Sequence, residues 1–208
     1  MNGLAIGFYR VAEWVTRLAY VNLLWIAFTL VGLIVFGFAP ATAAMFAVVR
    51  KWVSGEDDIP IFKTFWKVYR KEFWKIFGVG FILAVVGYFI YIEFSILRTQ
   101  DSLMYYLASF GVIGQYILYF IVVMYFFPIY AHFDLKPFAY LKWAFAIGVS
   151  HPILTLFLAV VTNVLLYVTA VTLPILIVFF GGSVTAYILT WGASKTFSAY
   201  ERVYELNV

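Results

Sequence analysis

PATAAMFAVVRKWVSGEDDIPIFKTFWKVYRKEFWK, residues 40–75, is the stretch that decides how this chain folds. It carries seven of the fourteen Lys and Arg residues in a 208-residue chain that is 65 % hydrophobic and 12 % charged. The seven are Arg50, Lys51, Lys63, Lys67, Arg70, Lys71 and Lys75. Because basic residues of membrane proteins concentrate on the cytoplasmic side, this stretch is predicted to be cytoplasmic and to orient the rest of the chain.

The second half of the stretch, residues 56–75, is a basic amphipathic segment, in which Glu56, Asp57 and Asp58 precede an amphipathic helix at residues 60–75. Apolar residues recur at helical spacing, and basic residues fill the opposite side. Such a helix suits the lipid headgroup boundary or a protein partner. The candidate lipid- or partner-binding residues are Lys63, Phe65, Trp66, Lys67, Arg70 and Lys71. Nucleic acid also binds basic residues interleaved with aromatic ones, but this helix continues directly into an apolar span, so we expect no nucleic-acid partner.

The composition predicts an integral membrane protein with a single all-α domain, residues 1–208. Residues 1–17 have the loose periodicity of a short interfacial helix, and Leu18 to Phe38 form an apolar run about 31 Å long as a helix. This run is too long for a signal-peptide core, so no cleavage is expected. The chain has no cysteine, which excludes disulfides and thiolate chemistry.

The apolar segment 40–54 has two possible placements. Pro40 suits the first turn of a helix, and Gly55 suits a left-handed position just after its end. Ala39, Ala43 and Ala47 form a ladder of small residues, which allows close helix packing in lipid. We therefore expect residues 18–54 to form a helical hairpin, with the ladder packed on the first span.

The distribution of positive charge favours this hairpin. If residues 40–54 cross the membrane, 13 Lys and Arg residues are cytoplasmic and only Arg98 is outside. If they do not cross, Arg10 and Arg17 move outside and the division becomes 11 to 3. The positive-inside rule therefore predicts six membrane helices with both termini cytoplasmic, and five is the alternative. Segment 40–54 is short for a span, so protein or a thinned bilayer must shelter it.

Four further spans are predicted between residues 74 and 192: 74–94, 103–130, 144–170 and 175–191. The third is interrupted by Ser150-His151-Pro152, and residues 193–208 form a cytoplasmic tail. Gly80, Ala84, Gly182 and Ala186 are the predicted helix-packing positions of these spans. The expected fold is thus an all-α polytopic transmembrane bundle with a cytoplasmic amphipathic helix.

Few polar residues are placed at membrane depth, where they are costly and often functional. His151 and Asn163 are the candidates, although His151 is equally suited to bonding a carbonyl freed by Pro152. Glu93 is expected to meet water or Arg98. His132 and Asp134 are too few for a metal site. We therefore expect no catalytic residues, no cofactor and no metal.

Several motifs of the first 80 residues closely resemble the YesL-like family of small bacterial membrane proteins. They cover about residues 13–80, and the last three spans match only in length and character. The motifs are RLAYVNLLW at 17–25, FAPATAA at 38–44, RKW at 50–52, GE at 55–56, IFKTFW at 61–66 and YRKEF at 69–73.

The resemblance implies a function that composition does not. Members of that family are typically encoded in Gram-positive bacteria beside binding-protein-dependent importers and enzymes for plant polysaccharides such as rhamnogalacturonan. It implies a non-catalytic accessory subunit of a carbohydrate ABC importer in the bacterial cell membrane. The implied partners are the permease subunits, with the ATPase and the substrate-binding protein in the same complex. An independent small carrier or channel, or a stability factor for the importer, are the alternatives.

Overall fold

The computed structural model describes residues 3–99 and 102–205, and all regular structure in these residues is helical. The predicted all-α class is therefore confirmed. The helices are α1 (Gly3–Val31), α2 (Phe38–Val53), α3 (Ile61–Arg98), α4 (Leu103–His132), α5 (Pro137–Ser150), α6 (Pro152–Thr172), the π-helical turn η1 (Ile177–Gly181) and α7 (Gly182–Glu205).

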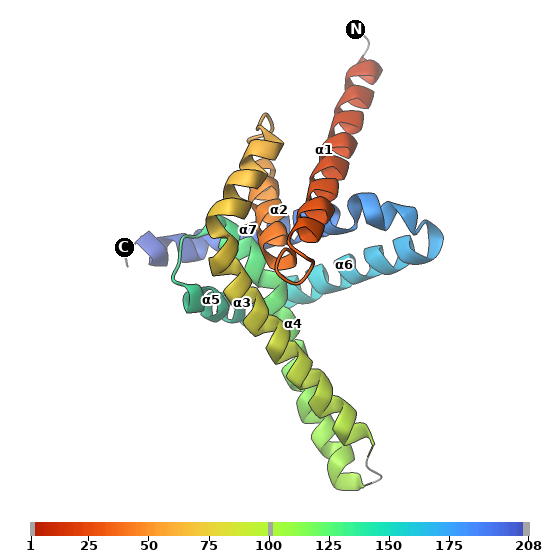
Figure 1. Cartoon of the computed structure of the whole chain (residues 1–208), viewed down its shortest axis with the longest axis vertical. Helices are drawn as coiled ribbons and strands as arrows, with labels where there is room; N and C mark the ends of the chain where they lie inside the picture. Colours follow the sequence, from red (N-terminus) through yellow and green to blue (C-terminus); the bar gives the residue numbers. More distant parts are fainter. Residues whose placement is uncertain (1–2, 100–101, 206–208) are drawn as a thin grey trace.

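Helix α2 lies at the centre of the molecule, where it packs on α1, α3, α4 and α7 (Figure 1). Eleven of its 16 residues are buried. Alanines in its first two turns let the neighbouring helices approach closely, and Pro40 occupies the first turn, where no intrahelical N–H bond is lost. As predicted, Gly55 follows the helix in the left-handed conformation, with a φ of 88°.

Helix α1 differs from its predicted division at residues 17 and 18. It is a single helix from Gly3 to Val31, and not a surface helix followed by a span to Phe38. Neither proline nor glycine interrupts the sequence at Arg17-Leu18, so one helix continues through both segments. The reversal comes at residues 32–37, where the backbones of Gly32 and Gly37 approach too closely for a Cβ on either.

Helices α3 and α4 form a long hairpin that projects towards the bottom of Figure 1. Helix α3 has 38 residues and joins the basic segment to the apolar span without a break, as the sequence suggested. The hairpin of α6 and α7 projects to the right, so the two hairpins diverge from the centre around α2 (Figure 1).

Five helices in the described part of the chain are long and apolar enough to cross a membrane. They are Gly7–Val31, Ile61–Arg98, Leu103–His132, Pro152–Thr172 and Ile177–Ser198. With 16 residues, about 24 Å, α2 is not among them. Whether α2 crosses stays a prediction, but protein covers most of it, as a short membrane helix requires.

The predicted span 144–170 is divided in two at His151. Helix α5 ends at Ser150 and α6 begins at Pro152, with Pro152 in its first turn. The Thr155 hydroxyl donates a 2.8 Å hydrogen bond to the Gly148 carbonyl, the group that loses an intrahelical donor because of the proline. The carbonyl freed by Pro152 is therefore bonded by threonine. The His151 ring nitrogen Nδ1 lies 3.2 Å from the Ile147 carbonyl instead.

Candidate functional site

The first half of α3 presents a basic surface that we call the basic face: Lys63, Lys67, Arg70 and Lys71. All four side chains are exposed. Trp66 beside them is 41 % exposed. These five residues are therefore accessible to a partner or to lipid headgroups, as the sequence predicted for each of them.

Phe65 was predicted to belong to this surface, and that prediction is wrong. Its side chain is fully buried, and its ring centre lies 5.2 Å from that of Phe28 on α1. The sequence prediction grouped Phe65 with Trp66, but α1 buries Phe65 completely and covers Trp66 only in part. Phe65 therefore anchors the basic face and does not belong to it.

A second anchor fixes the orientation of the basic face. Tyr69 is 6 % exposed, and its hydroxyl donates a 3.0 Å hydrogen bond to the Phe28 carbonyl near the end of α1. Trp66 packs on the same Phe28 ring at 5.5 Å. The Phe28 ring contacts four aromatic rings of α3, those of Phe62, Phe65, Trp66 and Tyr69, so the basic side of α3 is held outwards as a rigid surface.

The alanine ladder of α2 packs on α3, and not on the first span as predicted. A Cβ added at Gly80 would clash with the Ala39 Cβ. Ala43 is buried, and half-buried Ala47 borders a cavity shared with side chains of α3. Helix α1 instead meets the neighbouring side of α2, where the Trp25 indole donates a 3.0 Å hydrogen bond to Thr42.

Of the other predicted packing positions, one is exposed and two lie at close contacts between helices. Ala84 is exposed, one turn beyond Gly80 on α3, because α2 does not extend that far. Ala186 on α7 is fully buried. A Cβ on Gly182 would lie 2.8 Å from the Asn22 side-chain oxygen, so glycine is required for this close approach.

Asn22 is a structural residue that the sequence reasoning missed. It is fully buried on α1, and its amide nitrogen donates to the Val178 carbonyl at 2.7 Å. Its oxygen accepts a 2.8 Å hydrogen bond from the Ser183 backbone N–H. The π-helical turn η1 shifts the local hydrogen-bonding pattern at this point, and Asn22 bonds one group within the turn and one just after it. The sequence signal for this role is an asparagine in the middle of an apolar run, since a polar side chain there needs a hydrogen-bond partner.

A second missed feature is a polar cluster beside the basic face, formed by Glu72, Lys75, Tyr130 and Tyr140. The Tyr130 hydroxyl donates a 2.6 Å hydrogen bond to Glu72, whose carboxylate also lies 3.8 Å from the Lys75 ammonium. That ammonium stands 5.5 Å from the Tyr130 ring centre and 5.4 Å from that of Tyr140. The cluster thus ties α3 to α4 and α5 by charge-assisted hydrogen bonding and cation–π attraction.

Two more elements, α2 and α7, meet α4 at the edge of this cluster. The His132 ring on α4 lies 2.7 Å from the Glu201 carboxylate on α7, and the His132 carbonyl accepts a 3.4 Å bond from Arg50 on α2. A cavity of about 230 Å³ opens between the cluster and Ala47. Within the described residues, no three His, Asp or Glu side chains converge as metal ligands.

Among the described residues, two groups outside the membrane-spanning helices, Tyr140 and Glu56, have shifted pKa values. Burial raises the pKa of the Tyr140 hydroxyl, which donates to the Phe133 carbonyl and accepts from the Leu135 N–H. The hydrogen bond from Lys51 lowers the pKa of the Glu56 carboxyl in the exposed loop after α2.

The two predicted intramembrane polar residues lie apart from this cluster. His151 occupies the break between α5 and α6, and Asn163 is exposed on α6, where its amide bonds the Ala159 carbonyl at 2.8 Å. Asn163 borders a mostly apolar cavity of about 430 Å³ between α1, α2, α4, α6 and α7. The structure therefore does not bring His151 and Asn163 together.

Comparison with known proteins places the chain among bacterial relatives. Residues 18–94 match the family described as protein of unknown function, DUF624. Three Bacillus subtilis proteins are similar over most of their length: YteU (40 % identity, 86 % of this chain and 79 % of that protein), YesL (36 %, 97 % and 95 %) and YesV (33 %, 93 % and 92 %). No solved structure matches the chain. The chain therefore belongs to the YesL-like family, the family of the DUF624 domain.

Proposed function

We propose that this protein is a non-catalytic accessory membrane subunit of a carbohydrate ABC importer, which it joins by binding the permease subunits. The observation that carries the proposal is the basic face, four exposed cations on a helix that Phe65 and Tyr69 fix to α1. A rigid charged surface suits a protein partner, because little conformational entropy is lost on binding. The family resemblance supplies the importer as the partner.

The proposed complex contains the ATPase and the substrate-binding protein besides the permease, and its substrates are oligosaccharides of plant polysaccharides. In the proposed topology both termini are cytoplasmic and the basic face meets the cytoplasmic side of the permease. Acidic side chains of a partner complement this surface, and anionic lipid headgroups complement it in the same way. The apolar outer surfaces of α3, α4 and α6 are free to contact the permease within the membrane.

Copurification tests the proposal directly. A tagged copy is expressed with its neighbouring permease, ATPase and binding protein, and detergent extracts are examined for all four. We expect the permease to be recovered with the wild type and to be lost when Lys63, Lys67, Arg70 and Lys71 are all changed to Gln. Recovery of none of the importer subunits with the wild type would overturn the proposal.

A matched variant controls for the loss of charge itself. Arg10, Lys136, Lys142 and Lys195 are four exposed cations elsewhere in the molecule, and their change to Gln removes the same charge. This control is expected to retain the permease. Equal recovery by both quadruple variants would show that the basic face is not the contact surface. Permease abundance in a deletion strain is measured in parallel, since a mere stability factor lowers it.

One observation favours the alternative of an independent carrier, namely the cavity of about 430 Å³ that Asn163 borders. Thr42, Thr162 and Thr185 also line it, but most of its wall is aliphatic or aromatic. Such a wall suits a polar sugar poorly, since buried hydroxyls need hydrogen-bond partners. Liposomes that contain only this protein are therefore expected to take up no oligosaccharide, and uptake above that of empty vesicles would favour the carrier.

A further inference from the structure

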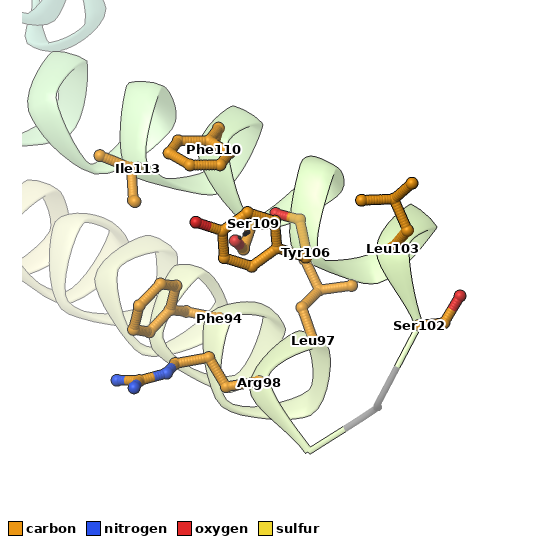
Figure 2. A pocket seen from close by; sticks show the side chains of 9 residues that line it. All are labelled: Phe94, Leu97, Arg98, Ser102, Leu103, Tyr106, Ser109, Phe110 and Ile113. Atoms are coloured by element: carbon orange, nitrogen blue, oxygen red, sulfur yellow. Dashed lines mark hydrogen bonds between the residues drawn. The ribbon is translucent and has the colours of Figure 1, made fainter.

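A cavity of about 790 Å³ lies at the far end of the α3–α4 hairpin, distant in sequence from the basic face (Figure 2). Its described wall combines one cation with hydroxyl groups and apolar side chains from both helices. The lining residues are Phe94, Leu97, Arg98, Ser102, Leu103, Tyr106, Ser109, Phe110 and Ile113. Gln100 and Asp101, which connect the helices, lie outside the described residues.

Arg98 is the only cation among these lining residues. Its guanidinium lies 5.6 Å from the centre of the Phe94 ring, and Figure 2 shows it folded back along α3 towards that ring. Within the described residues no carboxylate lies within ion-pair distance of Arg98, and Glu93, its predicted partner, is exposed. The guanidinium therefore has hydrogen-bond donors available for an anion.

The start of α4 adds donors on the same side of the cavity. The helix begins at Leu103, and no side chain caps it. The first N–H groups of a helix lack intrahelical partners and carry partial positive charge. The Tyr106 side chain lies between the two helices in Figure 2, and the free N–H groups make this end of the hairpin suited to a polar, negatively charged group.

An apolar slot of about 190 Å³ continues from this cavity along the crevice between α3 and α4. The two spaces share Phe94 and Ile113 in their walls. The slot is lined by Ile90, Tyr91, Phe94, Val112, Ile113 and Tyr116. A cationic cavity joined to an apolar slot matches an amphiphile, because the cavity suits a charged headgroup and the slot suits a hydrocarbon chain.

We propose that this site binds an anionic phospholipid, with the phosphate at Arg98 and one acyl chain in the slot beside Ile113. Arginine pairs with phosphate through two parallel N–H···O bonds, and the neighbouring aromatic rings suit the membrane interface. Free phosphate offers the same headgroup chemistry, but it leaves the slot empty. The slot is therefore the feature that points to a lipid.

Native mass spectrometry of the purified full chain in detergent tests the proposal. The protein is incubated with equal amounts of phosphatidylglycerol and phosphatidylcholine that carry the same acyl chains, and retained lipid is counted. We expect the wild type to retain phosphatidylglycerol about tenfold better, and Arg98→Gln to lose this preference. Arg10→Gln, an exposed cation on α1, is the matched control and is expected to keep it.

The slot has its own variant, Ile113→Trp, which adds bulk at the wall that the slot and the cavity share and leaves Arg98 itself unchanged. Ile113 is 41 % exposed, so the larger side chain is expected to be accommodated, and a monodisperse elution profile checks this. It should lower retention of phosphatidylglycerol several-fold. Equal retention of both lipids by the wild type, or unchanged retention by Arg98→Gln or Ile113→Trp, would overturn the proposal. Competition by glycerol phosphate at the affinity of the lipid would also overturn it, in favour of a free phosphate.

Discussion

Helix α2 and the part of α3 beyond Gly80 are both apolar and both contain small residues. Helix α2 is mostly buried, whereas this part of α3 is mostly exposed. Eleven of the 16 residues of α2 are buried. In α3 only five of 38 residues are buried, and Ile90 is the single one of these beyond Gly80. In a membrane chain, hydrophobicity thus does not distinguish core from surface. The neighbouring helices determine which apolar residues are buried. The same substitution should therefore change the free energy of unfolding more at a buried position than at an exposed one.

The largest difference is expected between Gly80 and Ala84, one turn apart on α3. Gly80→Leu should lower the free energy of unfolding by about 3 kcal/mol, because the new side chain must displace Ala39 and separate α2 from α3. Ala84→Leu, on an exposed position, should change it by less than about 0.5 kcal/mol. Reversible unfolding in mixed micelles measures both. Equal effects would show that α2 does not pack against α3 at Gly80.

A somewhat smaller difference is expected between Asn22 and Asn163. Asn22→Leu leaves the buried Ser183 N–H and the Val178 carbonyl without their side-chain partner, which should cost about 2 kcal/mol. Asn163→Leu removes one bond to a carbonyl of its own helix on an exposed surface and should be nearly neutral. Thermal unfolding in detergent compares the two variants. A larger loss of stability for Asn163→Leu than for Asn22→Leu would contradict the buried position of Asn22 and the exposed position of Asn163.

Lys75 and Lys71 provide a third pair, of equal charge. The Lys75 ammonium faces the Tyr130 and Tyr140 rings, whereas the Lys71 side chain is 75 % exposed. Lys75→Met should therefore lower the free energy of unfolding by about 1 kcal/mol, and Lys71→Met should leave it unchanged. The same micelle titration applies. Similar values for the two variants would mean that the cation–π contacts contribute no net stability.

The smallest effect is expected at Glu56, in the exposed loop after α2. Its pKa is lowered in the folded state, so its ionised form adds stability above the pKa of the unfolded chain, and this contribution is lost as the pH falls through the lower, folded value. Glu56→Gln should slightly lower the unfolding temperature at pH 7 and match the wild type in acid. A difference that grows on acidification would contradict this sign.

Much of the architecture was predictable from local sequence. The long apolar runs, the continuity of the basic helix with its span, Pro40 in the first turn and Gly55 after the end of α2 are each set by residues within one or two turns of each other. The division of α1 at residue 17 was wrong because a change in polarity does not interrupt a helix. The chain reverses at residues 32–37, where Gly32 and Gly37 approach closely and Leu33 and Ile34 have positive φ.

The candidate site was predictable only where it faces outwards. The four cations of the basic face follow from helical periodicity, but periodicity does not show that Phe28 of α1 covers Phe65 and leaves Trp66 accessible. The alanine ladder was identified correctly, while its partner helix was not. The polar cluster joins Glu72 to Tyr130, residues 58 positions apart, and no local pattern indicates such a contact.

The bond between Asn22 and the η1 turn also has a consequence for biosynthesis. Asn22 enters the membrane early in translation, but its partners Val178 and Ser183 are 156 and 161 residues further along the chain. Until α7 is inserted, the Asn22 amide must bond water, lipid or a chaperone, because a bare amide in hydrocarbon is costly. The first span therefore reaches its final hydrogen-bonding state only after the last one has been made. A ribosome-stalled or truncated chain that ends before residue 178 should thus expose this amide to the membrane quality-control proteases.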